Sequence, residues 1–221
     1  TVEKLNMPKN KIQIVWFKRD LRITDHRPIF EASINSIPTL PIYIVETDYW
    51  KQPFASKRHW SFIHDSLKDL RKDLKNIGQS LIVRSGSVKQ IFEELSHHYN
   101  IISILSHEET GNQWTYDRDK SLQNWCLQNN ISFTEFPSNG IVRRLKNRSE
   151  WSKIRNSRMK EKLVSTPTNL IPLIGIDEGI IPSKEDPVFE NNYKGIVQKG
   201  GRSEVLKIME SFLSYRGKNY T

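Results

Sequence analysis

Five short apolar segments recur at regular intervals through the first 136 residues of the chain. Each segment is rich in β-branched and aromatic residues, which is typical of a buried strand. The predicted strands are residues 12–17, 40–45, 80–84, 101–105 and 131–136. Pro41 is expected at the beginning of the second strand, because proline cannot donate a hydrogen bond inside a sheet.

The segments between these strands carry apolar residues at helical spacing. The longest stripe has its members three or four positions apart and consists of Trp60, Ile63, Leu67, Leu70, Leu74 and Ile77. The predicted helices begin at Thr24 or Asp25, at Ser56, at Ser87 and at Thr115, which are suitable capping residues. Alternating strands and helices require right-handed crossovers. The sequence therefore predicts an α/β fold with a five-stranded, doubly wound parallel sheet, Rossmann-like, in strand order 3-2-1-4-5.

The alternation of strands and helices stops after residue 136. Ser149 can cap a basic helix over 150–163, and residues 164–200 contain prolines and glycines without periodicity, which is typical of a connector. A new amphipathic helix is predicted after Gly201. We therefore expect an α/β domain over 1–136, an interdomain linker over 137–200, and over 201–221 the first helix of a truncated helical domain.

Composition excludes several classes of protein. The single cysteine, Cys126, rules out an internal disulfide and predicts a cytoplasmic protein. No segment approaches the roughly 20 apolar residues that span a bilayer, so no membrane partner is expected. The chain has no GxGxxG after its first strand, no Walker loop and no Cys/His zinc spacing, so ordinary dinucleotide binding and a metal site are not predicted.

Positive charge is concentrated in the last third of the chain. The protein has 34 basic and 25 acidic residues, a net charge of +9, and residues 143–162 alone hold nine basic residues against two acidic ones. Two interpretations stay open for this segment. It is either a solvated helix face or a surface that faces phosphate groups, with Arg143, Arg144 and Arg148 as polyanion contacts.

Charged and polar residues gather where the predicted parallel strands end. In a doubly wound sheet, ligands bind at the carboxyl ends of the strands where the strand order reverses. The residues expected at this crevice are Phe17, Lys18, Arg19, Asp20, Glu46, His107, Glu108, Glu109, Asn112 and Trp114. Trp114 either stacks on a planar ring or fills the cleft. No catalytic residue is predicted, because the acidic pair after the fourth strand has no partner nucleophile.

The turn after the first strand carries alternating charges at Arg19, Asp20, Arg22 and Asp25. Two interpretations are open here as well. The four side chains either form an internal salt-bridge network that holds the turn, or they contact a ligand.

Residues 15–26, VWFKRDLRITDH, resemble the opening signature of the photolyase/cryptochrome family, a WF-R/K-RDLR-x-x-D-N pattern. His26 stands where that family usually has Asn. The resemblance implies that the α/β domain carries a light-harvesting antenna chromophore, which is a reduced folate, a deazaflavin or a flavin. It also implies that FAD belongs to the helical domain of the full-length protein.

The same resemblance implies light-driven pyrimidine-dimer repair or blue-light signalling for the full-length protein, with DNA and the chain's own C-terminal helical domain as partners. The segment on its own is expected to be inactive. Two alternatives stay open on the residues alone. They are a stand-alone, universal-stress-like nucleotide-binding module and a basic nucleic-acid-binding module.

Overall fold

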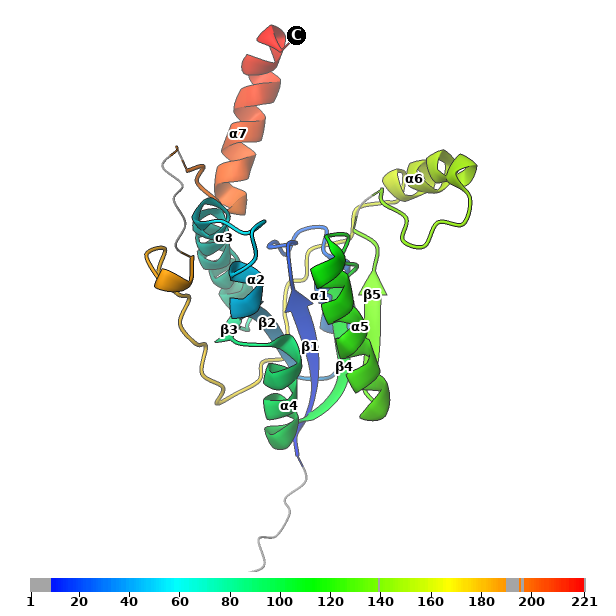
Figure 1. Cartoon of the computed structure of the whole chain (residues 1–221), viewed down its shortest axis with the longest axis vertical. Helices are drawn as coiled ribbons and strands as arrows, with labels where there is room; N and C mark the ends of the chain where they lie inside the picture. Colours follow the sequence, from blue (N-terminus) through cyan, green and yellow to red (C-terminus); the bar gives the residue numbers. More distant parts are fainter. Residues whose placement is uncertain (1–8, 139, 190–194, 196, 221) are drawn as a thin grey trace, which may run out of the picture.

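A five-stranded, all-parallel sheet forms the centre of the molecule, in the order β3-β2-β1-β4-β5 (Figure 1). The structure, a computed structural model, describes residues 9–138, 140–189, 195 and 197–220. The strands are β1 (Lys11–Phe17), β2 (Thr39–Val45), β3 (Ile82–Ser85), β4 (Asn100–His107) and β5 (Ser132–Phe136). The predicted fold class and strand order are confirmed.

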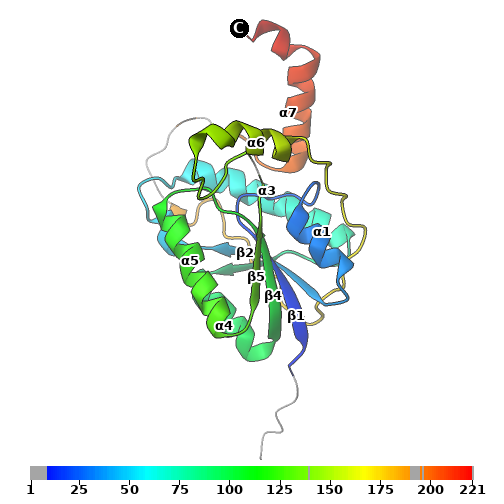
Figure 2. The same ribbon diagram turned by 90° about the vertical axis from the view of Figure 1, so that its right-hand side faces the viewer.

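Helices cover both faces of the sheet (Figure 2). On one face lie α1 (Arg27–Ile34) and α3 (Lys57–Asn76), and on the other lie α4 (Val88–His98) and α5 (Gln113–Gln128). Successive strand side chains point to opposite faces, so Ile14 and Val15 of β1 belong to two separate hydrophobic cores. A short helix, α2 (Thr47–Trp50), follows β2.

The stripe predicted for the longest helix is found in α3. The side chain of Ser56 accepts a hydrogen bond from the backbone N–H of His59 and caps the helix. Leu67, Leu70 and Leu74 are buried against the sheet. The helix ends before Gly78, whose φ of +100° is strained for any residue with a side chain.

Two helices of the α/β domain begin at caps other than those predicted, and Ser87 precedes α4 as predicted but its side chain makes no capping hydrogen bond. Helix α1 begins after His26, not after Thr24 or Asp25, because the buried His26 ring accepts the N–H of Ile29. Helix α5 begins after Asn112, whose side-chain oxygen accepts the N–H of Thr115. Thr115 is therefore not the cap, and its hydroxyl donates to the Asn112 carbonyl oxygen instead.

Two strand details also differ from the prediction. Strand β4 continues to His107, which the sequence places in a loop, because His107 pairs with Phe136 of β5. Pro41 lies inside β2, not at its beginning. The backbone nitrogen of Pro41 points to the same side of β2 as the N–H of Thr39, which is the side on which β3 lies. Strand β3 pairs with β2 only from Ile42 onward, so no ladder hydrogen bond is lost at Pro41.

Helices α6 (Trp151–Met159) and α7 (Arg202–Ser214) project beyond the carboxyl ends of the strands (Figures 1 and 2). Neither helix has a buried residue. The basic helix is shorter than the predicted 150–163. A 3-10 turn, η1 (Arg148–Glu150), precedes it, and after Met159 the backbone N–H groups of Lys160 and Glu161 bond three residues back instead of four. Asn147 caps this turn by accepting the N–H of Ser149, so Ser149 is not the cap.

The described part of 164–200 runs along the outer edge of the sheet. Thr39 of β2 forms a parallel bridge with Pro172, and Val83 of β3 donates its N–H to the carbonyl of Glu178. A short 3-10 turn, η2 (Pro187–Phe189), packs Phe189 into the core. A second, η3 (Arg216–Asn219), follows α7. The segment before α7 therefore protects a sheet edge that would otherwise expose unpaired backbone groups.

Within the described part of the chain, no helix combines the length and the apolar character that a bilayer crossing needs.

Candidate functional site

A cleft of about 1150 Å³ opens at the carboxyl ends of β1, β2 and the loop after β4. This is the point at which the strand order reverses, between β1 and β4. The cleft continues past α2 and α3 to the beginning of α7, where Gly201, Arg202 and Val205 line it. The residues from the predicted site that line the cleft are Phe17, Lys18, Arg19, Glu46, Glu109 and Asn112.

The other four predicted residues lie beside the cleft and do not line it. Asp20 and His107 belong to a hydrogen-bonded cluster described below. Glu108 donates its backbone N–H to the Phe136 carbonyl. Trp114 packs edge-on against Tyr49, with their ring centres 5.5 Å apart. Trp114 thus supports an aromatic wall of the cleft from behind.

That aromatic wall is absent from the predicted site. It consists of Tyr43, Tyr49, Trp50, Phe54 and Phe62. The signal is present in the sequence, since the first three lie within seven residues of the predicted end of β2. The sequence does not show that these residues form one wall, because the packing of α2 and α3 decides which of their faces line the cleft.

Arg118 of α5, also absent from the predicted residues, lines the cleft and organises its acidic groups. Its guanidinium lies 2.6 Å from a Glu46 carboxylate oxygen, 2.8 Å from Asp119 and 3.4 Å from Glu109. The guanidinium also lies over the Trp16 ring, 4.8 Å from its centre. Arg118 therefore joins the ends of β1 and β2 to the loop after β4.

Lys18 forms a second cationic centre at the end of β1. Its ammonium group lies 3.0 Å from Asp119 and 3.5 Å from Glu135 of β5, and 4.4 Å from the centre of the Trp16 ring. The Lys18 side chain is only 6% exposed. A charge buried to this degree needs such partners, so Lys18 holds the floor of the cleft together.

Burial shifts the protonation of the cleft carboxylate. Burial raises the pKa of Glu46 to about 7, although the guanidinium of Arg118 opposes that shift. Burial by itself would lower the pKa of Arg118, but the charges of Glu46 and Asp119 raise it above its ordinary value. Near neutral pH, Glu46 therefore exchanges a proton while Arg118 stays charged.

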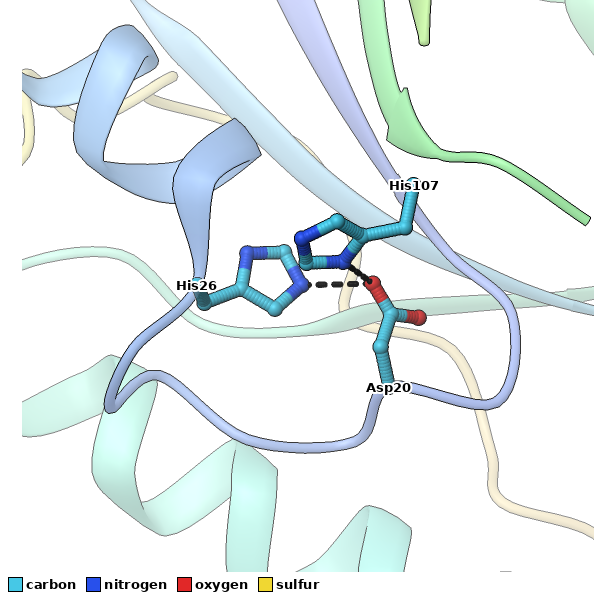
Figure 3. A group of neighbouring side chains, drawn as sticks. All are labelled: Asp20, His26 and His107. Atoms are coloured by element: carbon cyan, nitrogen blue, oxygen red, sulfur yellow. Dashed lines mark hydrogen bonds and ion pairs between the residues drawn. The ribbon is translucent and has the colours of Figure 1, made fainter. Parts of the chain in front are cut away.

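Asp20, His26 and His107 form a buried cluster behind the cleft (Figure 3). One carboxylate oxygen of Asp20 lies 2.7 Å from Nε2 of His26 and 2.6 Å from Nδ1 of His107. The other oxygen accepts the backbone N–H of Lys18. Burial would raise the pKa of Asp20, but attraction to His26 and the hydrogen bonds from both imidazoles hold it well below its usual range.

A backbone hydrogen bond fixes the tautomer of His26, and this decides whether the cluster suits hydrogen bonds or a metal ion. Its Nδ1 accepts the N–H of Ile29, so the ring proton is on Nε2 and points at Asp20. If Nε2 bound a metal ion, the ring proton would have to be on Nδ1. Two hydrogen-bond donors, Nδ1–H and the N–H of Ile29, would then face each other, which is unfavourable. Two histidines and a carboxylate could in principle bind a metal, but this arrangement fits hydrogen bonds. Burial lowers the pKa of His26 despite the attraction of Asp20.

The turn after β1 is held by partners other than those predicted. Arg19 pairs with Glu109 at 3.5 Å, and Arg22 donates to the backbone carbonyls of Thr24 and Asp25. The Asp25 carboxylate accepts the backbone N–H of Val164. Within the described residues the four charged side chains do not pair with one another, so the first of the two interpretations, an internal salt-bridge network, is not found. Each of the four side chains is instead bound to a side chain outside this set of four or to a backbone group.

The three predicted polyanion contacts lie near β5 and α6. Arg143 is bound by Glu135 through two hydrogen bonds of 3.0 and 2.9 Å. Arg144 and Arg148 are exposed. The structure thus brings Arg143 into the charge network of the cleft floor and leaves the other two in solvent.

The fold and the cleft define a Rossmann-like α/β domain with its ligand site at the strand-order reversal. The sequence model of the DNA photolyase family matches residues 13–155, which is more than half of the chain. The chain therefore belongs to the DNA photolyase family, and corresponds to the N-terminal domain of photolyases and cryptochromes.

Curated relatives agree with this assignment. Cryptochrome DASH of Gloeobacter violaceus is 25% identical over 223 residues, covering 91% of this chain and 44% of the relative. The chloroplastic/mitochondrial cryptochrome DASH of Arabidopsis thaliana is 30% identical over 105 residues, covering 45% of this chain and 18% of the relative. A deoxyribodipyrimidine photo-lyase of Agrobacterium fabrum is 33% identical over 82 residues, covering 37% and 16%.

Solved structures show the same fold. A Synechocystis cryptochrome superimposes with a TM-score of 0.76 at 18% identity, over 96% of this chain and 48% of that one. An archaeal photolyase from Sulfolobus tokodaii gives 0.68 at 21% identity, over 89% and 45%. The chain spans less than half the length of these relatives.

Proposed function

We propose that this chain is the light-harvesting domain of a longer photolyase or cryptochrome and that its cleft binds an antenna chromophore. The observation that carries the proposal is the aromatic-walled cleft at the strand-order reversal. The Sulfolobus tokodaii photolyase, which shares the fold, is described with two FAD molecules and the implication of a novel light-harvesting cofactor. Neither alternative, the stand-alone nucleotide-binding module or the nucleic-acid-binding module, is favoured by the family match.

The residues of the cleft fit a planar chromophore with an anionic tail. Tyr49, Trp50 and Phe54 provide faces for a ring system, and Arg19 and Arg22 provide donors for phosphate or carboxylate groups. The volume of about 1150 Å³ lies just above the range of about 300–1000 Å³ that is usual for ligand sites in proteins, so the cleft has room for such a molecule. A reduced folate, a deazaflavin and a flavin all meet this description.

Glu46 and Arg118 would decide how the ring system is held. A carboxyl group with a pKa of about 7 either donates or accepts a hydrogen bond, so Glu46 can pair with a ring N–H or with a ring carbonyl. The Arg118 guanidinium fixes the position of that carboxyl group. When bound, the chromophore would absorb light and pass the excitation energy to FAD in the full-length protein.

The full-length protein is proposed to carry out light-driven pyrimidine-dimer repair or blue-light signalling, with FAD as its cofactor and DNA as a partner, as the family implies. The present chain alone is expected to be inactive. Helix α7 supports the proposed division into 1–136, 137–200 and 201–221. Leu206, Met209, Phe212 and Leu213 are exposed on it, as expected for a helix that packs against a helical domain. The single cysteine keeps the cytoplasm as the proposed compartment.

A titration of the 221-residue chain with FAD, a reduced folate and a 5-deazaflavin, followed by ligand fluorescence, tests the proposal. At least one is expected to bind, and Tyr49→Ala is expected to weaken binding roughly fivefold, since an aromatic contact is worth about 1 kcal/mol. The matched control is Tyr116→Ala, which removes an exposed tyrosine of α5 outside the cleft lining. Binding of none of the three, or equal losses in both variants, would overturn the proposal.

A further inference from the structure

Residues 143–162, here called the basic arm, carry charge that the fold does not use. The arm has nine basic residues against two acidic ones, a net of +7. Arg143 is bound by Glu135. The exposed basic side chains that form no ion pair within the described residues are Arg144, Lys146, Arg148, Lys153, Arg155, Lys160 and Lys162. Because unpaired charge of one sign repels itself, such a concentration indicates an anionic partner.

The arm folds back on the segment that leads into it, residues 140–141, and its first residue is bound to β5, so its charges are partly held in place. The indole N–H of Trp151 donates to the Gly140 carbonyl at 3.1 Å, and Arg158 donates to the Ile141 carbonyl at 2.7 Å. The two hydrogen bonds from Arg143 to Glu135 fix the base of the arm to β5. A partner therefore meets a partly ordered surface, which lowers the entropic cost of binding.

The distribution of apolar residues distinguishes a phosphate backbone from a lipid surface. Trp151 and Met159 are 42% and 63% exposed and lie eight residues apart on α6, on one side of the helix. Arg155 lies between them on the same side, with its guanidinium 5.9 Å from the Trp151 ring. A helix that lies in a membrane interface needs a continuous apolar face, and this charge interrupts it. The arm therefore fits phosphate groups better than a bilayer.

We propose that the basic arm is a binding surface for the sugar-phosphate backbone of nucleic acid, independent of base sequence and separate from the chromophore cleft. None of the arm's residues lines the cleft. Lys and Arg contacts to phosphates release counterions and carry no base information, so affinity should depend on salt and not on sequence. The arm would add non-specific affinity to whichever protein contains this domain.

Fluorescence anisotropy of the 221-residue chain with two labelled 20-base-pair DNA duplexes of unrelated sequence tests the proposal. Both duplexes are expected to bind with similar affinity at 50 mM salt. Substituting Arg144→Gln, Lys146→Gln, Arg148→Gln and Lys153→Gln together should weaken binding at least tenfold. It should also reduce the slope of log affinity against log salt by about 0.9 for each phosphate group that the variant no longer neutralises.

The matched control removes four exposed basic residues that lie outside the arm, by Lys11→Gln, Lys68→Gln, Lys72→Gln and Lys120→Gln. It has the same net charge as the arm variant and should keep its affinity within threefold. Far-UV circular dichroism checks that both variants fold.

Four results would overturn the proposal. They are no binding at 50 mM salt, equal losses in both variants, a more than tenfold preference for one duplex, and binding to vesicles of phosphatidylserine and phosphatidylcholine without binding to DNA.

Discussion

Two regions of this molecule are rich in Lys and Arg, and the structure treats them in opposite ways. Beneath the cleft, Lys18 and Arg118 are 6% and 12% exposed and face carboxylates at 2.6 to 3.5 Å. On the basic arm, Arg144, Lys146 and Arg148 are exposed and form no ion pair within the described residues. The first set joins five segments of the fold, which are the ends of β1 and β2, the loop after β4, α5 and β5, and the second joins none.

This difference distinguishes charged side chains that stabilise the fold from charged side chains that remain available to bind another molecule. Buried charges are tolerated only when they are paired, so removing one partner leaves an unsatisfied group and a large loss of stability. Exposed charges are solvated already and contribute little to stability. Four predictions test the comparison, beginning with the largest expected effect.

Asp20→Ala should lower the free energy of unfolding by about 3–5 kcal/mol, as measured by urea denaturation. The backbone N–H of Lys18 and the rings of His26 and His107 all lose their acceptor in this variant. The control is Asp48→Ala, at a side chain that is 72% exposed and pairs with the exposed Lys51, which should cost less than about 0.5 kcal/mol. Equal losses would contradict the distinction between buried and exposed charge.

The same contrast applies to two glycines, one in the body and one beside the arm. A Cβ on Gly200 would lie 1.9 Å from the Phe62 backbone oxygen, whereas on Gly140 it would meet the flexible side chain of Arg155. Gly200→Ala should therefore cost about 2–3 kcal/mol in urea denaturation and Gly140→Ala less than about 1 kcal/mol. The reverse order would show that the arm is packed as tightly as the body.

Glu46→Gln tests the cost of a buried carboxyl group whose pKa is raised into the neutral range. The pKa of Glu46 is about 7 in the fold against an ordinary 4.5, so the fold binds a proton that the unfolded chain has released between these values. The contribution of Glu46 to stability is therefore full below pH 4.5 and falls as the pH rises through 7. Glutamine cannot ionise and does not show this loss.

The stability of Glu46→Gln relative to the unsubstituted chain should accordingly improve by roughly 2–3 kcal/mol from about pH 4.5 to about pH 8. Urea denaturation of both proteins at a series of pH values gives this difference directly. A constant difference across that range would show that Arg118 offsets the full cost of ionising Glu46.

The smallest effect is expected on the arm. Gln substitutions at Arg144, Lys146, Arg148 and Lys153, made one at a time, should each change the free energy of unfolding by less than about 0.5 kcal/mol. Thermal unfolding of each variant measures this change. A loss above about 1 kcal/mol at any of them would mean that this charge stabilises the fold, as the charges of the cleft network do, and would contradict the comparison.

Much of the fold could be predicted because its signals are local. The stripe of α3 and the apolar strands depend on spacings of two to four residues, and parallel crossovers allow few topologies. The crevice could be placed for the same reason, and Phe17, Glu46 and Glu109 do line it. Arg118 and the aromatic wall could not be assigned, because helix rotation and side-chain direction are decided by packing.

The partners of the charged residues were the least predictable feature. Asp20 is expected from the sequence to pair within its own turn or with a ligand, yet one of its partners, His107, is 87 residues away. Arg118 and Glu46 are 72 residues apart. Sequence distance gives no information on such contacts, which exist only after the carboxyl ends of the strands have been brought together.

The sequence alone determined the five parallel strands, their order, the location of the crevice and the excess of positive charge after residue 136, because periodicity and composition are properties of neighbouring residues. Only the tertiary structure decided which charges are paired inside the protein and which face solvent. It places Lys18 and Arg118 beside carboxylates from distant segments, and Arg143 beside Glu135 of the preceding strand. Burial makes those pairings obligatory, whereas Arg144, Lys146 and Arg148 are solvated and need no partner within the fold.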